Sequence, residues 1–426
     1  MLTALRPVAL LCGLGAGLDR AGIAPCWRRG TQRERGPGAV GAAFGSVPGV
    51  TISIAEAAAE IAAHSERELE ALVAVSTPSG DLTGAEEALA VCAALLPPEA
   101  QIERAECSTP GGAPDLLARL AGTGSRRLLL LGHIDTVIAH EAHSPMRRDG
   151  ERLYGPGTAD MKGGVVLALG VARALAAAPQ DLAELAVLIV TDEEWRTVPF
   201  GHVERFAGYD ACLCFEAGER TPAGAEGVVV RRKAAGTLRV NAFGRSAHSG
   251  SAPDHGRNAL LALAGLAGEL AQFHAPTGPE RLSVVPTVMR SGDALNVVPA
   301  AGRLMLDLRA DRLGAFGPVR DAVPSERDGV RFEPELLREW PGMDSRGATE
   351  GLLAGATARL GRTIAPVSRG GASDASHFAA AIPLTVDGLG PRGGGAHTPG
   401  EFVTAASLQE RAEVALAVAV AVLAGV

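Results

Sequence analysis

The sequence predicts an α/β protein: a mixed, mostly parallel sheet flanked by helices, with a smaller α+β segment inserted into it. From residue 52 onward, short continuous apolar runs alternate with helical segments, as expected for strands buried on both faces of a sheet. Several of these runs end directly in histidine or carboxylate residues. Between residues 226 and 341 the alternation gives way to another order of strands and helices. We therefore expect one discontinuous domain that contains a second, inserted domain.

Length and composition restrict the classes of protein to which the chain can belong. With 426 residues it exceeds a single ordinary core, so at least two domains are expected. Its 47% apolar and 21% charged residues are typical of globular proteins, and no apolar run approaches the ~20 residues of a membrane span. A net charge of -8 argues against nucleic acid, because phosphate binding needs a basic face. We expect no membrane and no nucleic acid as partner, but a small molecule or peptide.

The first 52 residues differ from the rest of the chain. They are rich in Gly, Ala and Arg without a clear period, so residues 1–52 are interpreted as a disordered extension or a start codon assigned too early. Arg6 and the short apolar run after it leave a signal peptide as a less favoured alternative. The six cysteines are scattered, which fits a reducing cytoplasm rather than a disulfide framework. Cys212 and Cys214 are expected to be buried free thiols.

Residues 53–225 are expected to form the first part of the larger domain, and residues 342–426 the second. Periodicity predicts helices over 54–73, 85–96, 165–178 and 352–360, and strands over 127–131, 185–190, 211–215 and 382–386. Such alternation predicts a parallel sheet with helical crossovers.

Candidate functional residues follow three of the predicted strands. His133 and Asp135 end the first, and their spacing puts them side by side, an arrangement that fixes the tautomer of metal-binding histidines. Glu193 and Glu194 follow the second strand, and Glu216 follows the third. Ligands bind at this edge of open α/β sheets. If the chain stays extended after the second strand, Glu193 and Glu194 point in opposite directions.

Asp160 lies in a glycine-rich turn before the helix predicted over 165–178. Taken alone it is interpreted as a helix cap, since aspartate is favoured at that position.

The inserted domain, predicted over residues 226–341, has the order β-α-β-β-α-β. Its elements are expected over 228–243, 258–273, 282–298, 302–309, 314–322 and 330–340. This order predicts a ferredoxin-like α+β sandwich.

Seven segments, taken together, resemble the zinc carboxypeptidase, aminoacylase and acetylornithine deacetylase superfamily, and most closely its glutamate carboxypeptidase branch. They occur in the order and approximate spacing of that superfamily and cover the chain from about residue 53 to its end. They are Gly132-His-Ile-Asp-Thr136, Gly155-Pro-Gly-Thr-Ala-Asp-Met-Lys-Gly-Gly164, Thr191-Asp-Glu-Glu194, Phe215-Glu216, Gly244-Arg-Ser-Ala-His-Ser-Gly250, Asn296-Val-Val-Pro299 and Gly395-Ala-His397.

The resemblance implies a zinc-peptidase-like fold and a two-zinc hydrolase that cleaves an amide bond next to an amino-acid carboxylate. Cobalt or manganese are possible substitutes for the zinc ions. Asp160 would bridge the two ions, in a family where the following peptide bond is often cis. The other metal ligands would be His133 and Glu216 at one ion, and Glu194 and His397 at the other. Asp135 would orient His133, and Glu193 would act as general base.

The resemblance also implies roles for the inserted domain as a lid that carries a homodimer interface. His248 would reach the partner's active site and stabilise the oxyanion. Asn296 and Arg309 would bind the substrate carboxylate, although Arg309 could also form a plain surface ion pair. Gly371 would belong to a glycine-rich substrate loop. His377 is expected to be structural, and His140 and His143 to be surface residues.

Trp195 and Arg196 depart from the family pattern, which usually continues after the second glutamate with a small apolar residue and Gly-Ser. They either reshape the pocket or pack locally, and both interpretations stay open.

Three alternatives to a carboxypeptidase remain: an N-acyl-amino-acid deacylase of the acetylornithine or succinyl-diaminopimelate type, a dipeptidase, and a non-catalytic relative. Family members that act on free amino termini tend to carry aspartate where this chain has Glu216, which disfavours the dipeptidase.

Overall fold

The computed structural model describes residues 52–425. The predictions of an N-terminal extension or a signal peptide, and the cysteines at positions 12 and 26, lie outside the described residues. None of the helices within residues 52–425 has the length and hydropathy that a bilayer crossing requires.

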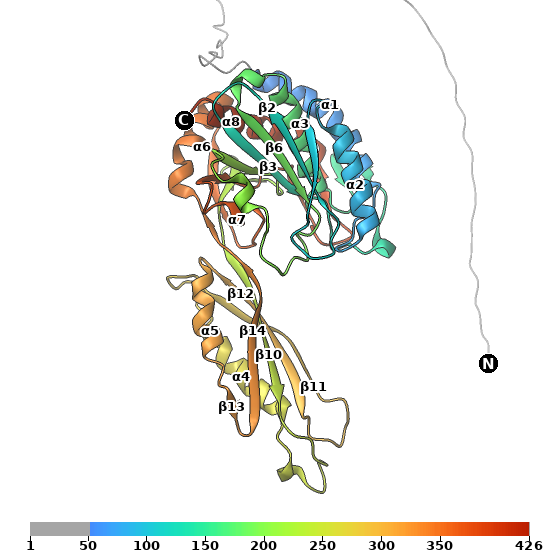
Figure 1. The fold of residues 1–426 in the computed structure, drawn as a ribbon, viewed down its shortest axis with the longest axis vertical. Helices are drawn as coiled ribbons and strands as arrows, with labels where there is room; N and C mark the ends of the chain where they lie inside the picture. Colours follow the sequence, from blue (N-terminus) through green and yellow to red (C-terminus); the bar gives the residue numbers. More distant parts are fainter. Residues whose placement is uncertain (1–51, 426) are drawn as a thin grey trace, which may run out of the picture. The chain divides into compact units, whose positions relative to one another are not determined.

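The central sheet of the described chain has six strands in the order β1-β2-β6-β3-β7-β17 (Figure 1). Strand β3 is parallel to both β6 and β7, and β17 is parallel to β7, whereas β1 and β2 are antiparallel to their neighbours. The strands are β1 (Gln101–Ala105), β2 (Asp115–Ala121), β3 (Arg127–His133), β6 (Glu184–Val190), β7 (Ala211–Cys214) and β17 (Leu384–Val386). The mixed, mostly parallel α/β fold predicted from the sequence is confirmed.

Both faces of this sheet are covered, as the continuous apolar strands predict. Leu128 and Leu130 of β3 belong to a core with helices α1 (Ile54–Val73), α3 (Lys162–Ala176) and α8 (Ala405–Leu423). Leu129 and Leu131, on the opposite face, pack in another core with the short helix α7 (Ala375–Phe378). Helices α2 (Leu82–Leu95) and α6 (Arg346–Leu360) complete this part of the chain (Figure 1).

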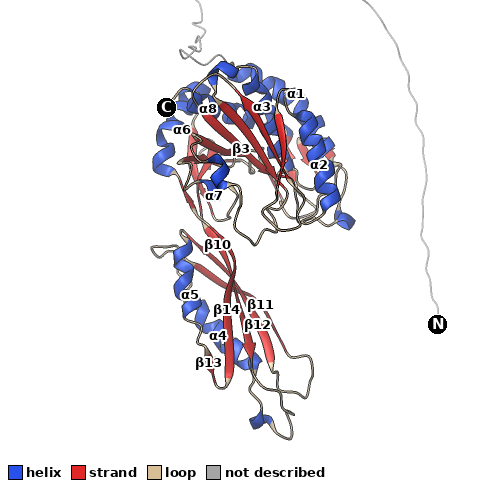
Figure 2. Cartoon of the chain, viewed as in Figure 1, coloured by secondary structure: helices blue, strands red, loops and turns tan. Residues whose placement is uncertain are grey.

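The inserted part contains an antiparallel sheet with the strand order β11-β12-β10-β14-β13 among the described residues (Figure 2). Along the chain its elements are β10 (Ala234–Phe243), α4 (Ala259–Ala271), β11 (Ser283–Ser291), β12 (Ala301–Ala310), α5 (Gly317–Asp321), β13 (Glu326–Arg327) and β14 (Val330–Trp340). The apolar faces of α4 and of the sheet form a core of their own.

Strand β9 (Glu226–Arg232), at the start of the predicted inserted domain, belongs to another sheet. It pairs with β8 (Glu219–Arg220), β15 (Met343–Asp344) and, in parallel, β16 (Ile364–Arg369). The domain boundaries at residues 226 and 341 stay a prediction.

A further small sheet has the order β18-β19-β5-β4. Its strands are β4 (Arg147–Asp149), β5 (Arg152–Tyr154), β18 (Gly393–Gly394) and β19 (Phe402–Thr404). Because β19 pairs with β5, this sheet joins the loop that contains His397 to the loop that contains Asp160.

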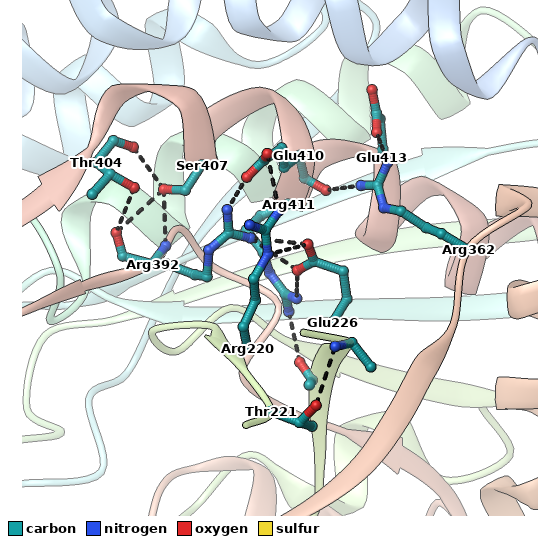
Figure 3. A network of polar contacts seen from close by, with 12 residues as sticks. Arg220, Thr221, Glu226, Arg362, Arg392, Thr404, Ser407, Glu410, Arg411 and Glu413 are labelled. Carbon is teal, nitrogen blue, oxygen red and sulfur yellow. Dashed lines mark hydrogen bonds and ion pairs between the residues drawn. The ribbon is translucent and has the colours of Figure 1, made fainter. Parts of the chain in front are cut away.

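A network of ion pairs joins the C-terminal helix to Glu226 and Arg392 (Figure 3). Arg411 of α8 donates to the carboxylate of Glu226 at 2.9 Å, and Arg392 donates to the same carboxylate. The Nε of Arg411 donates to the carbonyl of Gly390 at 3.2 Å, and the N–H of Gly390 donates to the carbonyl of Glu216 at 2.8 Å. The network therefore braces the backbone at Glu216.

Candidate metal centre

The ends of three parallel strands bring the candidate ligands together. His133 is the last residue of β3, Glu216 follows β7 by two residues, and Glu194 lies in the turn after β6. The strands β6, β3 and β7 are direct neighbours, so their carboxyl ends form one edge. His133 is buried at this edge, whereas His397 comes from a distant loop and is half exposed.

Asp160 lies between two histidines. Its Oδ1 is 3.1 Å from Nε2 of His133, and its Oδ2 is 3.2 Å from Nε2 of His397. Glu216 lies 3.7 Å from Nε2 of His133, and Glu194 lies 2.9 Å from Nε2 of His397. The five predicted metal ligands thus form two groups that share Asp160.

Asp160 does not cap the following helix. Helix α3 begins at Lys162, and its N-cap residue is Met161, whose side chain makes no capping bond. The cap interpretation of Asp160 is therefore wrong. The peptide bond between Asp160 and Met161 is cis, as the resemblance implies.

Glu193 and Glu194 do not lie in extended chain. Strand β6 ends at Val190, and residues 193–195 form a turn in which the N–H groups of Trp195 and Arg196 donate to the carbonyl of Asp192. The prediction of an extended chain at Glu193 and Glu194 is therefore wrong. One oxygen of each carboxylate lies within 4.8 Å of the other and of a His133 nitrogen.

Asp135 supports both His133 and this turn. Its Oδ1 is 3.4 Å from Nδ1 of His133, which also lies 3.1 Å from the carbonyl of Asp135. The backbone N–H groups of Glu193 and Glu194 donate to the Asp135 carboxylate at 3.2 and 3.1 Å. Asp135 thus links the end of β3 to the turn after β6, a contact that its spacing from His133 did not predict.

Glu401 is a further acidic residue at the centre, and the sequence reasoning missed it. Its carboxylate accepts hydrogen bonds from the N–H groups of Gly157, Ala159 and Asp160 at 2.8–2.9 Å. The glutamate is buried, although its neighbours Pro399 and Gly400 are exposed. It holds the loop between β5 and α3, which contains Asp160. Its position four residues after His397 was the available signal.

The electrostatics of the cluster fit divalent cations. Burial raises the pKa of Glu193 well above its ordinary value, and it raises the pKa of Glu216 to about 8. The carboxylates of Asp160 and Glu194 raise the pKa of His397 to about 10. The pKa of His133 is also raised, because neighbouring carboxylates outweigh the effect of burial. Crowded carboxylates of this kind favour positive charge among them.

The donor set and its spacing also fit zinc. Ligands at about 2.0–2.2 Å from a tetrahedral zinc ion lie roughly 3.3–3.6 Å from one another. The four donor distances in the two groups, 2.9, 3.1, 3.2 and 3.7 Å, lie on either side of this range. Carboxylate and imidazole ligands suit zinc, cobalt or manganese.

Arg196 is buried, and its partners show that it packs locally. Its guanidinium donates to Asp192 at 2.6 Å and to Asp374, and it lies over the rings of Phe200 and Trp340. It therefore ties the turn after β6 to the glycine-rich loop before α7.

Trp195 is partly buried, and its indole N–H is among the buried groups of residues 52–425 that have no hydrogen-bond partner.

The predicted substrate residues of the inserted domain form hydrogen bonds with their own neighbours and not with the metal ligands. His248 and Asn296 are neighbours, since the N–H of Ser249 donates to the Asn296 carbonyl at 3.0 Å. Arg309 donates to both carboxylate oxygens of Asp307 at 3.0 Å. Within residues 52–425, no hydrogen bond or ion pair joins His248, Asn296 or Arg309 to the metal ligands.

Gly371 lies in the exposed loop before α7, and its carbonyl accepts a hydrogen bond from Arg232 at 2.9 Å. His377 packs between the rings of Phe200 and Trp340. Burial lowers the pKa of His377 to about 3.

The remaining histidine and cysteine predictions agree with the structure. His140 is exposed and His143 is partly so, as expected for surface residues. Cys212 and Cys214, like the other cysteines of the described range, are buried and free.

Comparison with known proteins identifies the family. Residues 129–421 match peptidase family M20/M25/M40. Carboxypeptidase G2 of Pseudomonas sp. (strain RS-16) is 28% identical over 366 residues, covering 80% of this chain and 85% of the relative. Succinyl-diaminopimelate desuccinylase of Halorhodospira halophila is 29% identical over 336 residues, covering 72% of this chain and 85% of the relative.

Solved structures share the fold. An M20 family metallo-carboxypeptidase from Sulfolobus solfataricus superposes with a TM-score of 0.65 at 15% identity, covering 85% of this chain and 99% of its own. Aminopeptidase PepT from Bacillus cereus superposes with a TM-score of 0.67 at 19% identity, covering 85% and 98%. The chain is thus a member of peptidase family M20/M25/M40, whose enzymes are metal-dependent hydrolases.

Proposed function

We propose that this hydrolase uses two zinc ions to cleave an amide bond next to an amino-acid carboxylate, in the manner of a glutamate carboxypeptidase. One observation carries the proposal: the two oxygens of Asp160 face two different histidines, each with a further glutamate beside it. His133 and Glu216 would hold one ion, Glu194 and His397 the other, and Asp160 both. Zinc bound there would polarise the scissile carbonyl and acidify the attacking water.

Glu193 is the proposed general base. It is buried beside His133 and shares a turn with the ligand Glu194. A raised pKa suits a group that must take a proton from water and give it to the leaving nitrogen. Asp135 orients His133 and, through two backbone N–H groups, the turn that contains Glu193.

His248 is proposed as the donor to the oxyanion in the partner's active site. Its Nδ1 accepts the N–H groups of Gly250 and Ser251 at 3.1 and 3.2 Å, which assigns the proton of a neutral ring to Nε2. Nε2 then donates outward from an exposed loop, as an oxyanion donor must. Asn296, adjacent to His248, and Arg309 and Gly371 are proposed substrate contacts.

The chain is proposed to act as a homodimer through the inserted domain. Strand β11 is the edge strand of its sheet, and it exposes Val285, Val288 and Met289. An edge strand with unpaired backbone groups and apolar side chains is suited to pairing with a second copy. A cytoplasmic location is also proposed, because the cysteines of the described residues are free thiols.

An N-acyl-amino-acid deacylase is the second candidate, favoured by the similarity to succinyl-diaminopimelate desuccinylase. Both reactions use the same centre and differ in the acyl group. A substrate panel with added zinc separates them: folyl-glutamate, acetyl- and succinyl-amino acids, and dipeptides. Preferred turnover of folyl-glutamate supports the first proposal, and preferred turnover of an acetyl- or succinyl-amino acid supports the second. Preferred turnover of dipeptides, or no turnover of any compound, contradicts both.

Metal analysis tests the centre itself. Two zinc ions per chain are expected after reconstitution. Fewer than one ion per chain would revive the prediction of a non-catalytic relative.

A further inference from the structure

Arg338 carries a charge that no other residue of the described chain neutralises directly. It lies near the end of β14 and is partly buried. Its Nε is buried without a hydrogen-bond partner, and its guanidinium forms no ion pair within residues 52–425. The nearby Arg309 differs, because both oxygens of Asp307 occupy its fork. A guanidinium withdrawn from water is costly unless an anion binds to it.

A β-bulge decides which face Arg338 occupies. Phe332 and Leu336 of β14 pack on the core of the inserted domain. Leu336 opposes Leu238 of β10, but the register then shifts, and Arg338 opposes Thr237. The extra residue reverses the alternation of side chains along the strand. Arg338 therefore lies beside Thr237 on the face turned away from that core.

The same face carries Arg309. Thr237 opposes Asp307 of β12, and Arg309 is two residues further along that strand. A shallow groove on this face is lined by Thr237, Met305 and Asp307, together with residues of β11. Arg309 is paired with Asp307 on this face, whereas Arg338 has no ion-pair partner within residues 52–425.

Arg338 shares an aromatic neighbour with Arg196, which lies three residues after the proposed general base. Its guanidinium lies 4.3 Å from the centre of the Trp340 ring, and the same ring lies 4.7 Å from the guanidinium of Arg196 in the turn after β6. Burial lowers the pKa of Arg338, and the strongest opposing influence is the charge of Glu193. An anion bound at Arg338 would therefore lie near Arg196, three residues after Glu193.

We propose that Arg338 binds a carboxylate of the substrate. On this face of the sheet its guanidinium is free, whereas the guanidinium of Arg309 is occupied by Asp307. The inference rests on the proposed function, since it takes the carboxylate from an acylated amino acid. That carboxylate is either the one next to the scissile amide or a second one on an acidic side chain. Arginine suits both, because its planar fork binds carboxylates with two parallel hydrogen bonds.

Three matched substrates test the proposal with the zinc-loaded dimer: N-acyl-glutamate, N-acyl-glutamine and N-acyl-isoglutamine. The two amides each replace one carboxylate. For Arg338→Met we expect kcat/KM on N-acyl-glutamate to fall about 10- to 100-fold, and the preference over one of the two amides to disappear. The amide that loses its disadvantage identifies the carboxylate. Unchanged preference over both amides would overturn the proposal.

Two further variants separate binding from folding. Arg338→Lys keeps the charge without the fork and is expected to retain part of the preference. Arg320→Met removes an exposed arginine of α5 that pairs with Asp321, and it should leave the preference unchanged.

A direct binding measurement does not depend on turnover. By calorimetry we expect glutarate to bind the zinc-loaded wild type at least about tenfold more tightly than Arg338→Met. Equal binding to both proteins, or none to either, would overturn the role of Arg338. If the wild type hydrolyses none of the acyl-amino acids while glutarate binding depends on Arg338, the proposed function fails and the carboxylate site stands.

Discussion

Glu193 is the residue on which the proposed chemistry depends. Glu193→Gln keeps the size of the side chain and removes its ability to accept a proton. We expect kcat to fall about 10²- to 10⁴-fold while two zinc ions per chain remain bound, since the substituted amide would occupy the same turn. Steady-state kinetics and metal analysis of the same preparation check this. A variant with nearly normal kcat would show that another group is the base.

Substitution of Glu401 tests whether a residue outside the ligand set positions the proposed metal ligand Asp160. Glu401→Gln retains one acceptor oxygen for the three N–H groups that now share two. We expect the zinc affinity to fall about 10- to 100-fold, because partners that orient metal ligands typically contribute that much. Competition with a chelator measures it. The control is Glu350→Gln on the exposed side of α6, and equal affinity in both variants would contradict the role.

Arg196 acts between elements, since it joins the turn after β6 to the loop before α7. Arg196→Met leaves Asp192 and Asp374 buried without their cation. Removing one partner of a buried ion pair typically costs about 3–5 kcal/mol, so we expect the free energy of unfolding to fall by that amount. Denaturant titration measures it, with Arg320→Met as a surface control expected within about 0.5 kcal/mol of wild type. A change as small as that of the control would show that the buried pair contributes little.

The predicted helices and strands agree with the structure where the local sequence pattern determines them. Helix α1 spans Ile54–Val73, and strand β14 spans Val330–Trp340, as the periodicity predicts. Helix α2 begins three residues before its predicted start because Asp81 caps it, accepting the N–H of Gly84. The second strand predicted after Ser-Gly-Asp, over residues 294–298, is not formed.

Several of the missed elements depend on distant partners. The short strands β4, β5, β18 and β19 are two or three residues long and exist only through pairing with one another. Helix α8 was not predicted, because its alanine- and valine-rich run is buried on nearly every side and has no polar face. Its place among α1, α3 and α6 produces that pattern.

The proposed homodimer belongs to the scale of the whole molecule. Val288 is 40% exposed on edge strand β11, and Val288→Asp places a charge in the proposed interface. We expect a monomer by light scattering and a large loss of kcat, because His248 would no longer reach a partner's active site. Ile102→Asp, 46% exposed on edge strand β1, should stay dimeric. A dimeric Val288→Asp protein would place the interface elsewhere.

The sequence alone determined the α/β class, the strands β3, β6 and β7, and the acidic and histidine residues at their ends. These follow from apolar periodicity and from the rule that parallel strands end at one edge, both of which are local or topological. The roles of those residues as ligands came from the resemblance.

Only the tertiary structure placed the two carboxylate oxygens of Asp160 next to two different histidines. It also brought the carboxylate of Glu401 to the backbone N–H of Asp160, 241 positions away in the sequence. It also decided that the Glu193–Glu194 segment is a turn, and that a bulge carries Arg338 to the face of Arg309. The physical reason is that side-chain direction at a turn or bulge depends on hydrogen bonds to distant segments, which no local pattern records.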